Sequence, residues 1–261
     1  MKKLQLCLTT ILAMTLAVMF TNVSAVQART LDEIKKAGVL KVANSGAYPP
    51  FSFVDKGGNL VGFDVDIAKA IAKKIGVKAE VMSTPWNGII AALVVGKFDT
   101  CICSMSDTEE RRKAVDFTGS YYYSGQSLWV VNDSKIQSIK DLKGKKVGTV
   151  LGETSNKWAV ENGNWTNMTY QGLPDLLLAL TTGRINAAIS DDVPIALAVK
   201  KNNYKIRMVE AKELQRYPAA FSLQLGKPEL KAALQKALDE IKADGTYQEI
   251  VAKWIGHDIS K

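Results

Sequence analysis

Segments patterned like strands and like helices alternate along nearly the whole chain, and this alternation restricts the possible folds most strongly. Within one charged stretch, an apolar residue recurs at every fourth position, which predicts an amphipathic helix: Phe63, Ile67, Ile71 and Ile75. A strand-like segment follows at 77–82. Strands separated by helices of this length predict parallel sheets with helices on both faces, which is an α/β fold.

The alternation begins a second time after residue 125, and a helical stretch closes the chain, so the pattern predicts two lobes. The predicted strands are residues 39–43, 77–82, 98–104, 128–132, 146–150, 168–171, 187–190, 204–209 and 219–225. The predicted helices are residues 63–75, 86–95, 108–112, 155–161, 174–182, 193–201, 230–241 and 246–255. The pattern leaves open where the last two helices pack.

The first 28 residues have the pattern of a secretory signal peptide. Lys2 and Lys3 precede an apolar run at 8–20, and small residues close the segment at Ala28. The run is about 13 residues long, whereas a helix needs ~20 to span a bilayer. We therefore expect export and cleavage after Ala28, with an uncleaved anchor as the alternative.

Charge and residue types exclude several classes of protein. The formal net charge is +8, but lysines stand beside acids, as at 32–36 and 236–242, which indicates solvated helix faces and no nucleic-acid partner. His257 is the single histidine, so no zinc site or catalytic triad is predicted. The sequence has no glycine-rich dinucleotide motif, phosphate-binding loop or Gly-x-Ser-x-Gly elbow, and it implies no cofactor.

Two cysteines, Cys101 and Cys103, stand in the predicted strand 98–104. Residues two apart in a strand point to the same face, where they are poorly aimed to bond each other. We therefore expect two buried thiols, although the spacing leaves their redox state open.

Six motifs follow one another along the chain in the order that one known family shows. They are Leu-Asp-Glu-Ile-Lys-Lys-Ala-Gly-Val-Leu at 31–40, Tyr-Pro-Pro-Phe-Ser-Phe at 48–53, Gly-Phe-Asp-Val-Asp-Ile at 62–67, Thr-Glu-Glu-Arg at 108–111 with Asp-Phe-Thr at 116–118, Asp-Leu-Lys-Gly-Lys-Lys-Val-Gly at 141–148, and Asp-Gly-Thr-Tyr-Gln-Glu-Ile at 244–250 with Lys-Trp at 253–254. Together they resemble the periplasmic amino-acid-binding proteins of ABC importers, the family of histidine- and glutamine-binding proteins.

The resemblance implies a two-lobed, type II periplasmic-binding-protein-like fold, with two sheets, helices on both faces, two hinge strands and a ligand cleft. It places the first lobe at 29–122 and 225–261, the second at 126–218, and the hinges near 123–125 and 219–224. The two last helices would then pack on the first lobe.

The function implied by the resemblance is capture of a free L-amino acid in the periplasm and delivery to the membrane permease of an ABC importer. Closure of the lobes would bring residues of both lobes onto the ligand. The resemblance implies a monomer that makes and breaks no bond.

Eight residues match the ligand-binding positions of this family: Ser45, Tyr48, Trp86, Ser104, Ser106, Arg111, Thr154 and Asp191. Arg111 matches the arginine that holds the α-carboxylate by a two-pronged hydrogen bond. Thr154 matches the residue that meets this carboxylate from the second lobe, at a helix start that favours anions.

Asp191 matches the family's acidic residue that binds the α-ammonium of the ligand, and Asp192 is the competing candidate. Ser106 would add a hydroxyl and Ser104 a backbone group, and the rings of Tyr48 and Trp86 would enclose the ligand's side chain. Each residue also has a simpler interpretation without the resemblance. An arginine in Glu-Glu-Arg-Arg is commonly solvated, a threonine, serine or aspartate at a helix start commonly caps it, and an aromatic residue is commonly core.

Ser45 departs from the family pattern. Relatives that bind cationic or amide side chains often have an aspartate at this position, and a serine removes that charge. Val150 makes the pocket less polar still. We therefore predict a neutral ligand, unless an acid without a family counterpart, such as Asp192 or Glu153, reaches the pocket.

An enzyme on the same fold is the rival hypothesis. Cyclohexadienyl dehydratases resemble this family and use a glutamate three residues after the aspartate that matches Asp191. Pro194 stands there in this sequence and cannot act as an acid. The prediction is therefore binding without catalysis.

Overall fold

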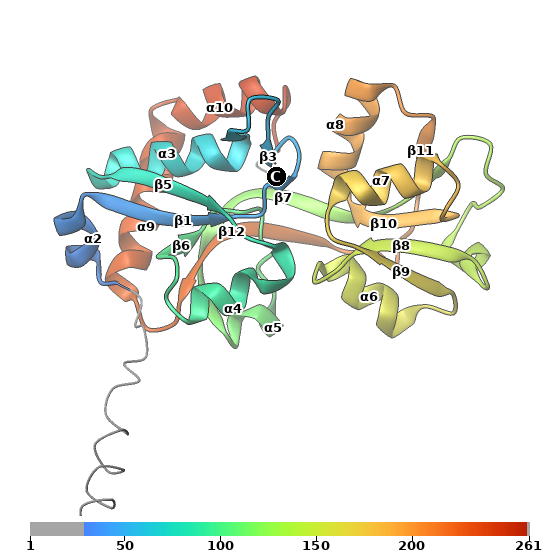
Figure 1. Cartoon of the computed structure of the whole chain (residues 1–261), viewed down its shortest axis with the longest axis horizontal. Helices are drawn as coiled ribbons and strands as arrows, with labels where there is room; N and C mark the ends of the chain where they lie inside the picture. The colour runs from blue at the N-terminus through green and yellow to red at the C-terminus, as the bar shows by residue number, and fades with distance from the viewer. Residues whose placement is uncertain (1–28, 260–261) are drawn as a thin grey trace, which may run out of the picture.

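Two α/β halves lie side by side in the computed structural model, which describes residues 29–259 (Figure 1). Strands β7 (Val115–Val131) and β12 (Arg216–Gln224) run between the halves. Residues 1–28, in which we predict the signal peptide, lie outside the described part of the chain. Among residues 29–259, no helix is both long and apolar enough to cross a membrane.

The main sheet has the strand order β5-β1-β6-β12-β7-β10-β8-β9, with β11 paired to β7. Its other strands are β1 (Val39–Asn44), β5 (Lys78–Ser83), β6 (Thr100–Cys101), β8 (Lys146–Val150), β9 (Thr166–Tyr170), β10 (Ala187–Asp191) and β11 (Ile206–Val209). A separate small sheet holds β2 (Ala47–Tyr48), β3 (Ser52–Val54) and β4 (Leu60–Val61).

The sheet is mixed, whereas the sequence pattern predicted only parallel pairing. Strand β1 pairs parallel with β5 and β6, and β8 with β9 and β10. The antiparallel pairs of this main sheet all involve the two long strands: β12 with β6 and β7, and β7 with β10 and β11. The pattern failed because β7, predicted only at 128–132, has 17 residues and begins at Val115.

Strand β7 changes partners near its middle. It pairs with β12 as far as Gly125, and Gln126 then lies opposite Asp191 of β10. The residues of β12 opposite 123–125 are 216–218. One strand therefore belongs to the sheets of both halves, and the lobe boundaries given above stay a prediction.

Helices cover both halves. They are α2 (Leu31–Ala37), α3 (Phe63–Ile75), α4 (Ile89–Val94), α5 (Glu109–Arg112), α6 (Thr154–Asn162), α7 (Leu173–Thr181), α8 (Asp192–Asn202), α9 (Pro228–Ala243) and α10 (Thr246–Trp254), with short 3₁₀ turns η1 (Trp86–Gly88) and η2 (Ile139–Leu142). Of the predicted apolar stripe of α3, Phe63, Ile67 and Ile71 are buried in the first half and Ile75 is partly buried; helices α9 and α10 pack against α3. Gly76 ends α3 in the left-handed conformation that favours glycine.

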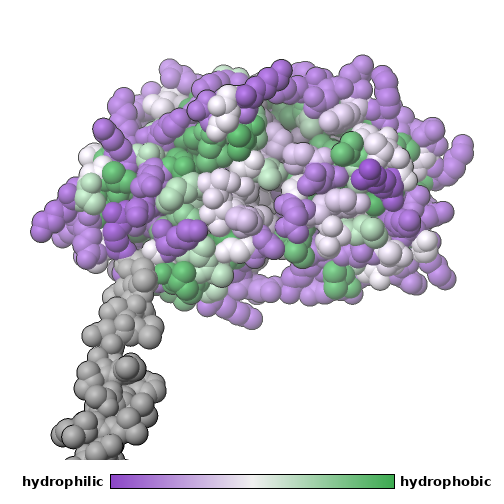
Figure 2. All heavy atoms as spheres, in the orientation of Figure 1, coloured by the Kyte–Doolittle hydropathy of each residue, from purple (hydrophilic) through white to green (hydrophobic). Residues whose placement is uncertain are grey.

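The second half has its own core. Leu173, Leu176 and Leu180 of α7 are buried there together with Trp129 of β7 and Ile195 of α8. Figure 2 shows hydrophilic residues along the outer edges of both halves, as the interleaved lysines and acids predicted. The two halves therefore hold separate cores and meet across the strands that they share.

Candidate ligand-binding site

A cavity of about 310 Å³ lies between the two halves, and all eight residues selected from the sequence line it. Its lining residues are Ser45, Ala47, Tyr48, Pro85, Trp86, Cys103, Ser104, Ser106, Arg111, Val150, Glu153, Thr154, Gln171, Gly172, Leu173 and Asp191. The first half contributes the segments around β2, η1, α5 and the loop after β6, and the second contributes the starts of α6 and α7 and the end of β10. Residues from distant parts of the sequence thus share one space, and their role in binding stays a prediction.

The Arg111 side chain forms hydrogen bonds with both halves of the protein. Its Nη1 donates to the carbonyl oxygen of Ser106 at 2.9 Å, and its Nη2 donates to that of Gly152, in the second half, at 3.0 Å. The guanidinium also lies 5.4 Å from the centre of the Trp86 ring. Burial lowers the pKa of Arg111, although nearby carboxylates oppose this shift.

The neighbouring Arg112 has the solvated role that the sequence left open for Arg111. It is exposed and pairs with the carboxylate of Asp107, to which its Nε donates at 2.6 Å. The four-residue helix α5, whose first turn Thr108 caps, points the two arginines to different surroundings.

Asp191 and Asp192, like Arg111 and Arg112, are adjacent in sequence but contact different surroundings. Asp191 ends β10, lines the cavity and accepts a hydrogen bond from the hydroxyl of Tyr48. Asp192 instead accepts from the hydroxyl of Ser124 and the backbone N–H of Gly125, both at 3.0 Å, and is not among the cavity residues. Its carboxylate accepts hydrogen bonds from the strand that crosses between the halves, so of the two aspartates it is Asp191 that lines the cavity.

Burial raises the pKa of Asp191 to about 6, against the hydrogen bond from Tyr48 and the charge of Arg111, which both lower it. At neutral pH this carboxylate is therefore mainly ionised. The cavity consequently holds a guanidinium and a carboxylate on opposite halves of the protein.

Thr154 is the first residue of α6 and the preceding Glu153 is its N-cap. No side chain caps this helix, and the hydroxyl of Ser155 donates to Glu153 at 3.1 Å instead. Neither Thr154 nor Ser155 therefore has the capping role considered above. Unsatisfied N–H groups at a helix start favour an anion.

The serines of the first half differ in what they can offer a ligand. Ser45 shares a hydrogen bond with Ser52, Oγ to Oγ, at 3.2 Å. Ser104 donates its hydroxyl to Asp64 at 2.7 Å and its backbone N–H to the Tyr121 hydroxyl at 2.8 Å, so its carbonyl is the backbone group left for a ligand. Within residues 29–259 the hydroxyl of Ser106 makes no hydrogen bond and is available.

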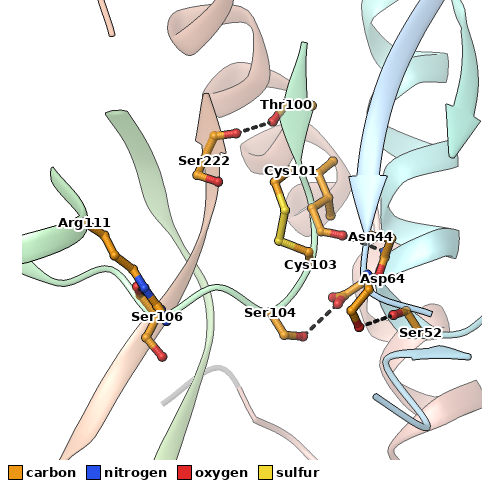
Figure 3. The surroundings of a disulfide bond; sticks show 12 residues. Asn44, Ser52, Asp64, Thr100, Cys101, Cys103, Ser104, Ser106, Arg111 and Ser222 are labelled. Carbon is orange, nitrogen blue, oxygen red and sulfur yellow. Dashed lines mark hydrogen bonds between the residues drawn. A yellow bond between two sulfur atoms is a disulfide. The ribbon is translucent and has the colours of Figure 1, made fainter. Parts of the chain in front are cut away.

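A buried acid holds the Ser104 segment from behind (Figure 3). Asp64, on α3, is almost fully buried and accepts from Ser104 and from the hydroxyl of Tyr121, at 2.6 Å in the latter case. Burial raises the pKa of the Asp64 carboxyl to about 8. These bonds secure Ser104 in a left-handed backbone conformation, φ +60°, which is uncommon outside glycine.

The two aromatic residues are partly exposed, and both line the cavity. Tyr48 packs against the cores of both halves and forms the hydrogen bond to Asp191. Trp86 stands on η1 with its ring beneath the Arg111 guanidinium. Neither ring is ordinary core, because each also holds a charged group of the cavity.

Residues 40–257 match the protein family described as bacterial extracellular solute-binding proteins, family 3. The chain belongs to this family. Among its relatives, the L-cystine-binding protein TcyJ of Escherichia coli (strain K12) is 36% identical over 234 residues, which cover 88% of each chain. The histidine-binding periplasmic protein of the same organism is 32% identical over 99% of each chain.

A solved structure of an ancestral arginine-binding protein bound to glutamine matches this solute-binding protein with a TM-score of 0.77. It is 40% identical and the match covers 84% of this chain and 99% of that one. The predicted two-lobed α/β fold is thereby confirmed. The relatives are binding proteins, which supports the prediction of a protein without catalysis, and Pro194 lies buried in the first turn of α8.

In this solute-binding protein, Cys101 and Cys103 form a disulfide, so the prediction of two thiols was wrong (Figure 3). Both residues are buried, as expected. Strand β6 ends at Cys101, and the same-face argument fails because Cys103 lies beyond the strand. The two Cα atoms are 5.4 Å apart, within the range that a disulfide requires. Disulfides persist in oxidising compartments, which agrees with an extracytoplasmic family.

Glu153 is an acid of the cavity that was not among the eight selected residues, although the sequence analysis named it, with Asp192, as an acid that could reach the pocket. It is half-buried, and its Oε2 accepts hydrogen bonds from Ser155 and from Ser190, the latter at 2.9 Å. Burial and the nearby charge of Asp191 raise the pKa of the Glu153 carboxyl to about 8. The sequence analysis did not find its N-cap position, because the helix was predicted to begin at Ser155 and begins at Thr154.

Proposed function

We propose that the protein captures a free L-amino acid in the cavity between its halves and delivers it to the membrane permease of an ABC importer. The observation that carries the proposal is the pair of opposite charges, Arg111 and Asp191, on either side of one small cavity. An amino acid is a zwitterion, so its carboxylate suits Arg111 and the start of α6, and its ammonium suits Asp191. The Ser106 hydroxyl and the Ser104 carbonyl then complete the ammonium site.

Relatives support this assignment by what they are named for. The two Escherichia coli proteins are named for L-cystine and for histidine, and the ancestral protein was solved with glutamine and, separately, with arginine. A thermal-shift screen of the twenty amino acids and cystine tests the proposal, because a ligand that binds only the folded state raises Tm. No shift with any of them would refute it.

Closure of the lobes is part of the proposed mechanism. Contacts that span the halves are already present: Arg111 donates to Gly152, Tyr48 donates to Asp191, and Lys157 forms an ion pair with Glu110 at 2.5 Å. A ligand bound to Arg111 and Asp191 at once adds contacts that only the closed arrangement provides, and so it stabilises that arrangement.

We propose a first lobe at 29–122 and 225–261 and a second lobe at 126–218. The change of partner on β7 at Gly125 supports a hinge at 123–125. We propose the second hinge at 219–224; the residues of β12 that lie opposite 123–125 are 216–218, directly before it. We also propose that the protein acts as a monomer and without a nucleic-acid partner.

At neutral pH we expect neutral L-amino acids to bind at least about tenfold more tightly than lysine or arginine. The side-chain end of the cavity offers the Ser45 hydroxyl, the Tyr48 and Trp86 rings and Val150. The nearby acid Glu153 is largely protonated at this pH, because its pKa is raised to about 8. A cationic side chain there loses water without gaining a charged partner, which is unfavourable by several kcal/mol. Calorimetric titration of glutamine, leucine, phenylalanine, lysine and arginine measures the difference.

The substitution Ser45→Asp is expected to narrow that gap, because it places a negative charge at the side-chain end. Ser83→Asp is the matched control: Ser83 is exposed and bonds the backbone of Ser45, but it does not line the cavity. If lysine or arginine binds wild type most tightly, the preference for a neutral ligand is wrong.

We propose that the signal peptide is removed after Ala28. Arg29 supports a mature N-terminus at this point, since its guanidinium pairs with Asp99 and donates to the carbonyl oxygen of Val39 at 3.0 Å. Mass spectrometry of the exported protein is expected to give an N-terminus at Arg29. Recovery of intact Met1 in the membrane fraction would contradict cleavage.

A further inference from the structure

The cavity is lined by one more acidic group than a simple zwitterion needs. Arg111 is the cation among the lining residues, and the acids are Asp191 and Glu153. A ligand carboxylate at Arg111 and an ammonium at Asp191 leave Glu153 without a partner of opposite charge. The nearest lysine on its own helix, Lys157, already pairs with Glu110 and Glu161.

The surroundings of Glu153 supply hydroxyl groups and one remote cation. Ser155 of α6 and Ser190 of β10 donate to its Oε2. Asp191 of β10 repels a charge on Glu153, Arg111 of α5 attracts it, and the phenol of Tyr48 interacts with it from β2. Within residues 29–259 the second oxygen, Oε1, makes no hydrogen bond, so it is free to meet a ligand.

An ionised carboxylate in such a place is unfavourable unless a cation joins it. The carboxyl group therefore has two stable conditions: protonated and neutral, or ionised beside a positive charge. The first suits a neutral side chain, because a protonated carboxyl both donates and accepts hydrogen bonds. The second suits a cationic side chain.

We propose that Glu153 determines the specificity of the cavity, accepting a neutral amino acid while it holds a proton and a cationic amino acid once that proton has left to water. The inference rests on the proposed function, because it takes for granted an α-carboxylate at Arg111 and an α-ammonium at Asp191. It assigns to Glu153 a role for which the family pattern offers no counterpart.

The direction of the pH effect follows from the raised pKa of Glu153, about 8. A cationic side chain favours the ionised carboxylate, so its affinity rises as the pH rises through this value, whereas the affinity of a neutral ligand does not gain in this way. With a pKa of about 8, the ionised fraction of Glu153 rises about tenfold between pH 7 and pH 9, and the protonated fraction falls about tenfold. The ratio of arginine to glutamine association constants should therefore rise by about tenfold if glutamine binds both forms, and by about 100-fold if it binds only the protonated form.

Other titrating groups cancel in this ratio. The two ligands have the same α-amino and α-carboxyl groups, so Asp191 acts on both alike. Asp64, with its pKa also raised to about 8, lies behind Ser104 in the first half and likewise acts on both. A change in the ratio therefore reports a group that meets the side chain.

The experiment is calorimetric titration of arginine and glutamine at both pH values, with wild type, Glu153→Gln and Glu161→Gln. Glu161 is an exposed residue on the same helix and serves as the matched control. We expect the ratio to rise in wild type and in the control and to stay constant in Glu153→Gln. A constant ratio in wild type, or a rising ratio in Glu153→Gln, would overturn the inference.

A second measurement needs no ligand. Carbon-13 NMR of glutamate-labelled, ligand-free protein should show one carboxyl that titrates near pH 8 and is absent from Glu153→Gln. If wild type binds neither arginine nor glutamine, the spectrum tests the inference alone: the inference fails if no glutamate carboxyl of wild type titrates near pH 8. The proposed function fails separately, if no amino acid shifts Tm in the screen described above.

Discussion

Replacement of Arg111 by alanine is expected to weaken amino-acid binding by about 2–5 kcal/mol, or roughly 30- to 5,000-fold. The guanidinium is held in place by the carbonyl oxygens of Ser106 and Gly152 and by the Trp86 ring, so it meets an incoming carboxylate already oriented. Its removal leaves that carboxylate desolvated and unpaired. Isothermal titration calorimetry with the ligand identified by the thermal-shift screen measures the loss.

Arg112→Ala is the matched control for this experiment. It removes the same charge from the next residue of α5, but Arg112 is exposed and pairs with Asp107 outside the cavity. We expect its affinity to stay within about threefold of wild type, because exposed ion pairs contribute ~0–1 kcal/mol. A loss of less than tenfold in Arg111→Ala would move the carboxylate site elsewhere.

Asp191→Asn is expected to have an effect of similar size, again about 2–5 kcal/mol of binding free energy. Asparagine keeps the shape of the side chain and can still accept the hydrogen bond from Tyr48, but it removes the charge that faces the ligand's ammonium. The expected outcome is thus a loss of affinity with a nearly normal Tm, measured by calorimetry and thermal unfolding of the same samples.

Asp192→Asn distinguishes the two candidates for the ammonium site. The Asp192 carboxylate bonds Ser124 and Gly125 rather than lining the cavity, so we expect its substitution to lower Tm more than it changes affinity. The reverse result, with Asp192→Asn abolishing binding and Asp191→Asn retaining it, would assign the ammonium to the other aspartate.

Periodic segments of the fold could be predicted from the sequence, and segments governed by distant partners could not. The four-residue repeat of α3 and the short apolar strand β8 were recognised because their buried residues are apolar and recur at the spacing of a helix or follow one another in a short run. Strand β7 was largely missed because its first part carries three tyrosines, glycines and serines instead of an alternating pattern, and its strand conformation depends on pairing with β12. Strands of two or three residues, such as β2 and β4, are too short to show any period.

The site was predicted from motifs, and its omissions have physical causes. All eight chosen residues line one cavity. They were chosen because they match the ligand-binding positions of a family whose arrangement is known. Glu153 had no counterpart in that arrangement, so the sequence could name it beside Asp192 but could not decide which of the two acids lines the cavity. The disulfide was missed because β6 was expected to continue to Ser104, whereas it ends at Cys101.

The path of the chain through the sheet also bears on the order in which the halves can form. In the first half, the hydroxyl of Thr100 bonds the carbonyl oxygen of Ser222, 122 residues away, whereas in the second half Thr149 bonds Asn167, 18 residues away. Closing the longer loop costs about 1.7 kcal/mol more in chain entropy. The second half can therefore assemble from near neighbours in sequence, while the first requires β12, α9 and α10, which follow all the other described elements along the chain.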